Sequence, residues 1–78
     1  MPKLIEWTAT EKPNVNQWYR VKQPELDYIK ITKDFYSPEK RTTYYKLLEY
    51  YQGETIYQGR TLAEARDLVR MLTYRKAE

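Results

Sequence analysis

The sequence predicts an α+β domain in which a three-stranded antiparallel meander is followed by one C-terminal amphipathic helix packed on one face. Two patterns carry this prediction: apolar and polar residues alternate between positions 28 and 58, and a capping signal after position 60 precedes apolar residues at helical spacing. The chain of 78 residues is near the lower size limit for a fold held by one hydrophobic core. We therefore expect a single domain over residues 1–78, with a sheet over 28–58, a helical region over 61–76 and an N-terminal region, 1–27, of strands or an arm.

The first two strands follow from the alternation of side chains. In residues 28–36, Ile29 and Ile31 alternate with Lys30 and Thr32, which is typical of a half-buried strand. The stretch TTYYKLLEYY at 42–51 is apolar or aromatic on both faces instead. One helix can cover only one of these faces, so the sequence raises the question of what covers the other.

The turns set the expected pairing of the strands. The polar loop SPEKR at 37–41 should place Tyr36 opposite Thr42, which sets Ile31 opposite Leu47. A two-residue turn at 52–53 should lead into a third strand over 54–58, with Ile56 opposite Glu49. The residues expected on the helix side are Ile29, Ile31, Phe35, Tyr45, Leu47 and Ile56. Those expected on the other side are Tyr28, Lys30, Thr32, Tyr44, Lys46, Leu48, Tyr50 and Tyr57.

The helix is the clearest element. Thr61 followed by Glu64 is a capping box, and the apolar residues after it recur every three or four positions, so we expect a helix over residues 62–74. Its buried stripe should consist of Leu62, Ala65, Leu68, Val69 and Leu72.

The first 27 residues are less regular. Residues 4–9 and 17–22 have the composition of short edge strands that extend the sheet to five, with a loop over 11–16 and a turn over 24–27. Trp7, Trp18 and Val21 are the apolar residues of this region that could fold over the tyrosine-rich face. The alternative is that this face stays open for a partner.

The composition argues against an enzyme. There is no cysteine and no histidine, so disulfides, thiolate metal sites and the commonest general base are excluded. The carboxylates are scattered, and neither glycine belongs to a phosphate-binding loop. We expect no catalytic, cofactor-binding or metal-binding residue. No run reaches transmembrane length and the start lacks the apolar core of a signal peptide, so we expect a cytoplasmic protein with no membrane partner.

Nine tyrosines, two tryptophans and a net charge of +3 favour a binding module. The first hypothesis is a protein partner or self-association, because the net charge is modest and tyrosines suit an amphipathic interface. The alternative is nucleic acid, with rings that stack on bases and lysines that contact phosphates. Both use the same expected partner-binding residues, which are Tyr28, Lys30, Tyr44, Lys46, Leu48, Tyr50 and Tyr57, with Arg41 and Arg60 as a basic rim.

Overall fold

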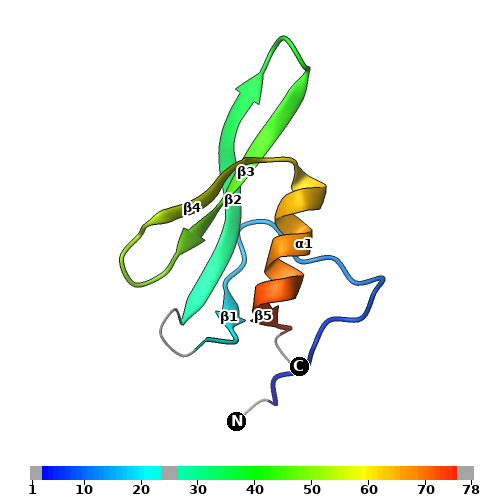
Figure 1. Cartoon of the computed structure of the whole chain (residues 1–78), viewed down its shortest axis with the longest axis vertical. Coiled ribbons are helices and arrows are strands. Elements are labelled where there is room, and N and C mark those ends of the chain that lie inside the picture. The colour runs from blue at the N-terminus through cyan, green and yellow to red at the C-terminus, as the bar shows by residue number, and fades with distance from the viewer. Residues whose placement is uncertain (1–2, 24–26, 76–78) are drawn as a thin grey trace.

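The computed structural model describes residues 3–23 and 27–75, which form one antiparallel sheet and one helix (Figure 1). The sheet has five strands in the order β4-β3-β2-β1-β5. The elements are β1 (Tyr19–Val21), β2 (Tyr28–Ser37), β3 (Thr42–Glu49), β4 (Thr55–Arg60), α1 (Leu62–Leu72) and β5 (Thr73–Tyr74). The α+β class is confirmed, and the meander of β2, β3 and β4 forms part of a wider sheet. The turn expected over 24–27 lies outside the described residues except for Asp27.

The core lies between α1 and one face of the sheet. Ile29, Ile31 and Leu47 from the central strands are buried together with Ala65 and Val69 of the helix. The rest of the helix stripe, Leu62, Leu68 and Leu72, is partly buried at the margin of this cluster. Burying each large aliphatic side chain contributes about 1.5–3 kcal/mol, so these few residues supply much of the stability of so small a domain.

A β-bulge in β2 changes the face of one predicted core residue. Ile31 pairs with Leu47 as expected, but the register shifts between Lys33 and Phe35, so that Phe35 pairs with Tyr44. The extra residue reverses the alternation, and Phe35 therefore lies on the face opposite the helix. The prediction that Phe35 belongs to the core is wrong. Asp34 stabilises the bulge, because its Oδ2 accepts a hydrogen bond of 3.1 Å from the backbone N–H of Gly59.

The connection between β3 and β4 also differs from the prediction. β3 ends at Glu49, the loop covers residues 50–54, and Ile56 pairs with Leu47 instead of Glu49. A second register shift follows in β4, where Tyr57 and Gly59 adopt φ values of 53° and 67°. The bulge turns Tyr57 toward the helix side, where it lines a pocket beside Ile56. The expectation that Tyr57 faces away from the helix is therefore wrong.

The capping box at the start of α1 is confirmed. Thr61 Oγ1 accepts a hydrogen bond of 3.3 Å from the N–H of Glu64, and a Glu64 carboxylate oxygen accepts one of 3.2 Å from the N–H of Thr61. The helix ends at Leu72, earlier than predicted, because Thr73 and Tyr74 continue as an extended strand that pairs with β1. This short strand was not predicted, since two residues carry no detectable alternation.

The N-terminal segment lies along the helix (Figure 1). The guanidinium of Arg66 donates to the carbonyl of Pro13 at 3.1 Å, and the Trp7 indole N–H donates to the Thr73 hydroxyl at 3.2 Å. Residues 4–9 form only an isolated bridge through Ile5, so the strand predicted there is wrong, whereas the strand predicted over 17–22 is observed as β1. In the described part of the chain, no helix is both long and apolar enough to cross a membrane.

The core makes a stability prediction. Leu47→Ala should lower the free energy of unfolding by about 2–5 kcal/mol, because it empties a fully buried position between the sheet and α1. Met71→Ala is the matched control, since Met71 is 71% exposed on the same domain and its loss should cost little. Urea denaturation of both variants gives the comparison. Equal losses of stability would contradict this location of the core.

The capping box makes a pH prediction. The backbone N–H of Thr61, then its hydroxyl and the Arg60 charge, lower the pKa of Glu64 below its ordinary value of 4.5. A lowered pKa means that this contribution to stability is full above the ordinary value and is lost as the pH falls through the lowered one. Glu64→Gln keeps an acceptor oxygen but does not titrate, so its melting temperature should fall less steeply on the acid side. Glu39→Gln, in the exposed β2–β3 turn, should retain the wild-type profile, and identical profiles for all three proteins would contradict the prediction.

Candidate functional site

The sheet face opposite α1, here called the open face, is the candidate site. Strand register places on it Arg20 from β1, Tyr28, Lys30, Thr32 and Phe35 from β2, Tyr44, Lys46 and Leu48 from β3, Thr55 from β4 and Tyr74 from β5. Trp18 precedes β1 and contacts one end of this face. No helix or strand of the described residues covers the rest, because α1 and the N-terminal segment both lie on the other side.

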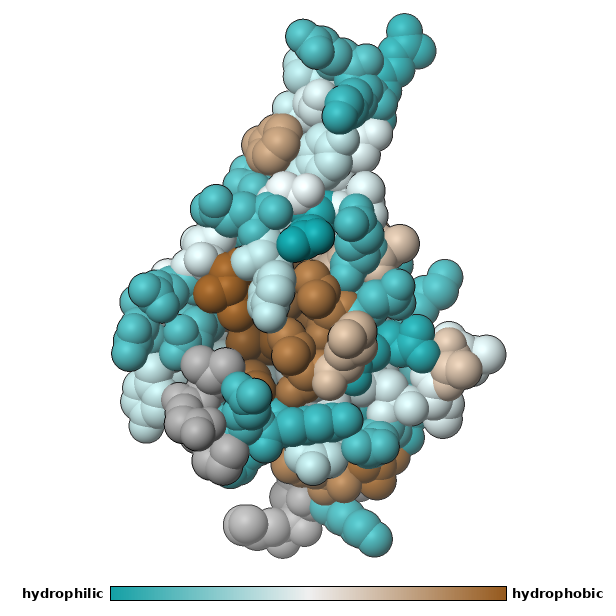
Figure 2. Space-filling view, in the orientation of Figure 1, coloured by the Kyte–Doolittle hydropathy of each residue, from teal (hydrophilic) through white to brown (hydrophobic). Residues whose placement is uncertain are grey.

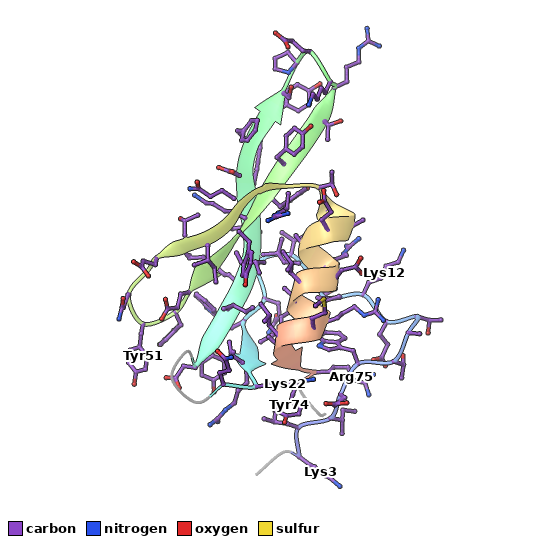
Figure 3. The ribbon with its side chains drawn as sticks, in the orientation of Figure 1. Lys3, Lys12, Lys22, Tyr51, Tyr74 and Arg75 are labelled. Carbon is purple, nitrogen blue, oxygen red and sulfur yellow. The ribbon has the colours of Figure 1, made fainter. Side chains whose placement is uncertain are left out.

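An aromatic cluster lies at the end of the open face near β1. The rings of Trp18 and Tyr50 meet edge to face with centroids 5.1 Å apart, and Tyr28 approaches Tyr50 at 5.9 Å. The ammonium of Lys30 lies 4.7 Å from the centroid of the Trp18 ring, a cation–π contact that contributes about 0.5–1 kcal/mol. Tyr51 follows in the β3–β4 loop, points away from the body of the molecule (Figure 3) and is 72% exposed.

A second aromatic pair lies toward the other end of the face. Phe35 and Tyr44 stack with centroids 5.0 Å apart, and Phe35 is 48% exposed. In the described chain no third strand pairs with this part of the β2–β3 hairpin, which extends beyond the helix (Figure 1). Arg41 adopts a φ of 51° in the turn at the tip of this hairpin. The open face thus has aromatic groups at both ends and Lys30, Thr32, Lys46 and Leu48 between them.

The charges of the open face have one sign. Its charged residues in the register are Arg20, Lys30 and Lys46, and no carboxylate is among them. Six acidic residues of the described structure lie in the helix-side pocket or in ion pairs. Glu49 and Glu54 line a pocket on the helix side, whereas Glu6, Glu11, Glu64 and Asp67 form ion pairs with Lys22, Arg75, Arg60 and Arg70. The two faces of the sheet therefore differ in electrostatic potential.

The structure brings together most of the residues expected to bind a partner. Tyr28, Lys30, Tyr44, Lys46 and Leu48 share the open face, and Tyr50 lies at its end. Tyr57 does not, because the β4 bulge turns it to the helix side. Arg60 also leaves the expected rim, since it pairs with Tyr45 on the helix side and its guanidinium lies 3.9 Å from Glu64.

Four residues that the register places on this face were not predicted there: Arg20, Phe35, Thr55 and Tyr74. Arg20 alternates with the buried Tyr19 and Val21, so extending the alternation through residues 17–22 would have found it. Phe35 had no such signal, because only the bulge places it there.

The idea that Trp7, Trp18 and Val21 together close the open face is wrong. Val21 is buried in the helix-side core, and Trp7 packs against Tyr19 of the same core with ring centroids 5.2 Å apart. Trp18 alone reaches the open face.

The arrangement offers stacking surfaces and cations. Among residues 3–23 and 27–75, no three side chains of metal-ligating type gather in one place. Comparison with models of protein families, with curated proteins and with solved structures found no match to this chain.

The exposure of Tyr50 makes a prediction that separates surface from core. Tyr50 is 55% exposed, so Tyr50→Glu should leave the protein folded and cost about 0.5–1.5 kcal/mol, the value of its aromatic contacts. Tyr45→Glu is the matched control, because Tyr45 packs against the helix-side core and a charge there should unfold the domain. Circular dichroism melting curves distinguish the two. Unfolding of the Tyr50 variant would show that this end of the open face is internal core.

Proposed function

We propose that this chain is a non-enzymatic binding module that holds single-stranded nucleic acid on its open face. The observation that carries the proposal is the combination of charge and aromatic rings on a face that no described helix or strand covers. Every charged residue placed there by the register is a cation, and aromatic groups lie at both ends. Cations on such a sheet track phosphates, while rings stack on bases of any sequence.

The dimensions of the face suit a short stretch of nucleic acid. Tyr44 and Leu48 are four residues apart on β3, which is about 13 Å at the rise of a strand. A stacked strand carries about one phosphate per 3.4 Å, so several phosphates pass over this distance. Lys30 and Lys46 lie between the two aromatic groups, within reach of that backbone. The half-exposed Phe35 is available for a base at one end, and Tyr50 at the other.

In the sequence, the modest net charge of +3 favoured a protein partner, but this value is a sum over the whole chain. Binding depends on the local potential, and Glu49, Glu54, Glu64 and Asp67 line the helix-side pocket or form ion pairs with Arg60 and Arg70. The open face is therefore more positive than the net charge suggests. A protein partner or a second copy of this chain is the competing occupant. Oligonucleotide binding and light scattering distinguish these occupants from nucleic acid.

The proposal predicts salt-dependent binding of an oligonucleotide. Fluorescence anisotropy with a labelled twenty-nucleotide single strand should show an affinity that falls steeply with salt concentration, because cations that contact phosphates release counterions. Lys46→Ala should weaken binding and reduce the slope of log K against log salt by about 0.7, the value for one phosphate contact on a single strand. Tyr44→Leu should cost about 1–3 kcal/mol of binding free energy without a change in slope, because it removes one stacking partner.

Lys12→Ala is the charge-matched control, because Lys12 is exposed on the N-terminal segment, far from the open face (Figure 3). It should bind like the wild type. A duplex of the same length tests strandedness, and tighter binding of the duplex would contradict the stacking platform. No binding of any oligonucleotide at low ionic strength would refute the proposal and favour the protein hypothesis. Light scattering that shows a dimer sensitive to Tyr50→Glu would then identify a second copy as the occupant.

A further inference from the structure

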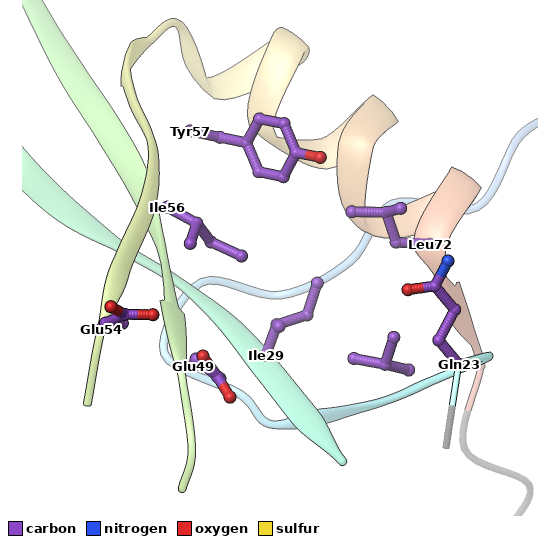
Figure 4. A pocket seen from close by; sticks show the side chains of 8 residues that line it. Gln23, Ile29, Glu49, Glu54, Ile56, Tyr57 and Leu72 are labelled. Carbon is purple, nitrogen blue, oxygen red and sulfur yellow. The ribbon is translucent and has the colours of Figure 1, made fainter. Parts of the chain in front are cut away.

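A pocket on the opposite side of the sheet has a different chemistry. It lies between β4 and the C-terminal end of α1 and has a volume of about 440 Å³, within the usual range of ligand sites. Ile29, Ile56 and Leu72 form an apolar wall (Figure 4), and Figure 2 shows hydrophobic side chains exposed in the hollow between these elements. An apolar surface open to solvent in so small a domain indicates a contact site.

The pocket exists because the helix is short and β4 is irregular. α1 has 11 residues and is therefore about 16 Å long, too short to cover every strand. Tyr57 and Gly59 interrupt the regular strand with positive φ values, and the Tyr57 ring extends toward α1 across the gap (Figure 4). The first half of β4 and the end of β3 consequently lie beyond the cover of the helix.

Glu49 is the unusual residue of this pocket. It is only 6% exposed, it lies opposite Ile29 in the sheet, and its carboxylate borders the apolar wall. Within the described parts of the chain, no hydrogen bond or ion pair engages that carboxylate. The pocket therefore presents a carboxylate beside an apolar wall, with room for a cation next to it. A cation bound there would be partly shielded from water, which strengthens its attraction to the carboxylate.

The rest of the pocket reinforces this charge. Glu54 provides a second carboxylate, and none of the described lysines or arginines lines the pocket. An occupant that fits must combine an apolar body with a cationic end. Arginine combines a hydrocarbon stem with a planar guanidinium that pairs with carboxylates in two parallel hydrogen bonds.

We propose that the pocket receives an arginine side chain of a partner polypeptide, with apolar neighbours of that arginine against Ile29 and Ile56. The surroundings favour a polypeptide over a small molecule. The loop that joins Glu49 to Glu54 carries Tyr50 and Tyr51, which are 55% and 72% exposed. Exposed tyrosines beside an apolar pocket are typical of a protein interface, in which an arginine anchor is surrounded by aromatic contacts. The chain then carries a basic face for nucleic acid and an acidic pocket for a basic protein segment.

The test uses an acetylated, amidated pentapeptide with a central arginine between leucines and alanines. Titration into ¹⁵N-labelled protein should give saturable shifts at the amides of Glu49 and of β4. The same peptide with citrulline, which is isosteric and neutral, should bind at least tenfold more weakly.

Variants of the protein test the carboxylate. Glu49→Gln should lower the affinity for the arginine peptide at least tenfold, and Glu39→Gln, in the exposed β2–β3 turn, should leave that affinity unchanged. Lys46→Ala should also leave the shifts unchanged, which separates this site from the open face.

Stability measurements make the test independent of affinity. Glu49→Leu should not lower the melting temperature of the free protein, because it replaces a carboxylate that has no ion pair among the described residues with an apolar side chain in an apolar pocket. A large loss of stability in both Glu49 variants would show that Glu49 has a structural partner and would overturn the proposal.

Three further outcomes would also overturn it. Equal binding of the arginine and citrulline peptides would show that charge is not recognised. Butylguanidine that binds as tightly as the peptide would identify a small cation as the occupant. A wild-type dimer in light scattering that Glu49→Gln dissociates would identify a second copy.

Discussion

The burial of Ile31 and Leu47 beneath Ala65 and Val69 is the contact on which the rest of the structure depends. It joins the two longest strands to the only helix described, and all four side chains are fully buried. The molecule measures 45 × 30 × 16 Å, so its thinnest dimension accommodates one sheet and one helix. Because the N-terminal segment packs along the helix through Trp7 and Arg66, residues 3–23 and 27–75 form no second layer on the other face. The N-terminal segment packs on the helix side, and for this reason it does not cover the open face.

Two β-bulges decide which aromatic residues belong to which surface. The bulge in β2 moves Phe35 from the expected core to the open face, where it stacks on Tyr44. The bulge in β4 moves Tyr57 in the opposite direction, into the pocket beside α1. The single residue inserted in β2 reverses the alternation beyond it, whereas the irregularity in β4 returns Arg60 to the face of Ile56 and displaces only the residues between them. The hydrogen bond from Gly59 to Asp34 links the two irregular positions and explains why they occur at the same level of the sheet.

The two faces of the sheet differ in charge as well as in the elements that pack against them. Lys30 and Lys46 share the open face with no carboxylate in its register, whereas Glu49 and Glu54 lie on the helix side. The distance between these groups is only the thickness of the sheet, so each side presents a potential that the net charge of the chain conceals. The loop after β3 borders both surfaces, because Tyr50 packs against Trp18 on the open side while its neighbours Glu49 and Glu54 line the pocket. A partner at one surface is therefore positioned to influence the other.

The sequence by itself determined the α+β class, the start of α1 and the central pairing of β2 with β3. These features depend on local signals: the capping box of Thr61 and Glu64, and the alternation that pairs Ile31 with Leu47. The sequence also placed five of its six helix-side residues on the correct face of the sheet. It did the same for six of its seven partner-binding residues. Only the tertiary structure decided the bulges, the short strand β5 and the course of the N-terminal segment. These depend on contacts between residues distant in sequence, such as Asp34 with Gly59 and Trp7 with Thr73, which local patterns do not encode.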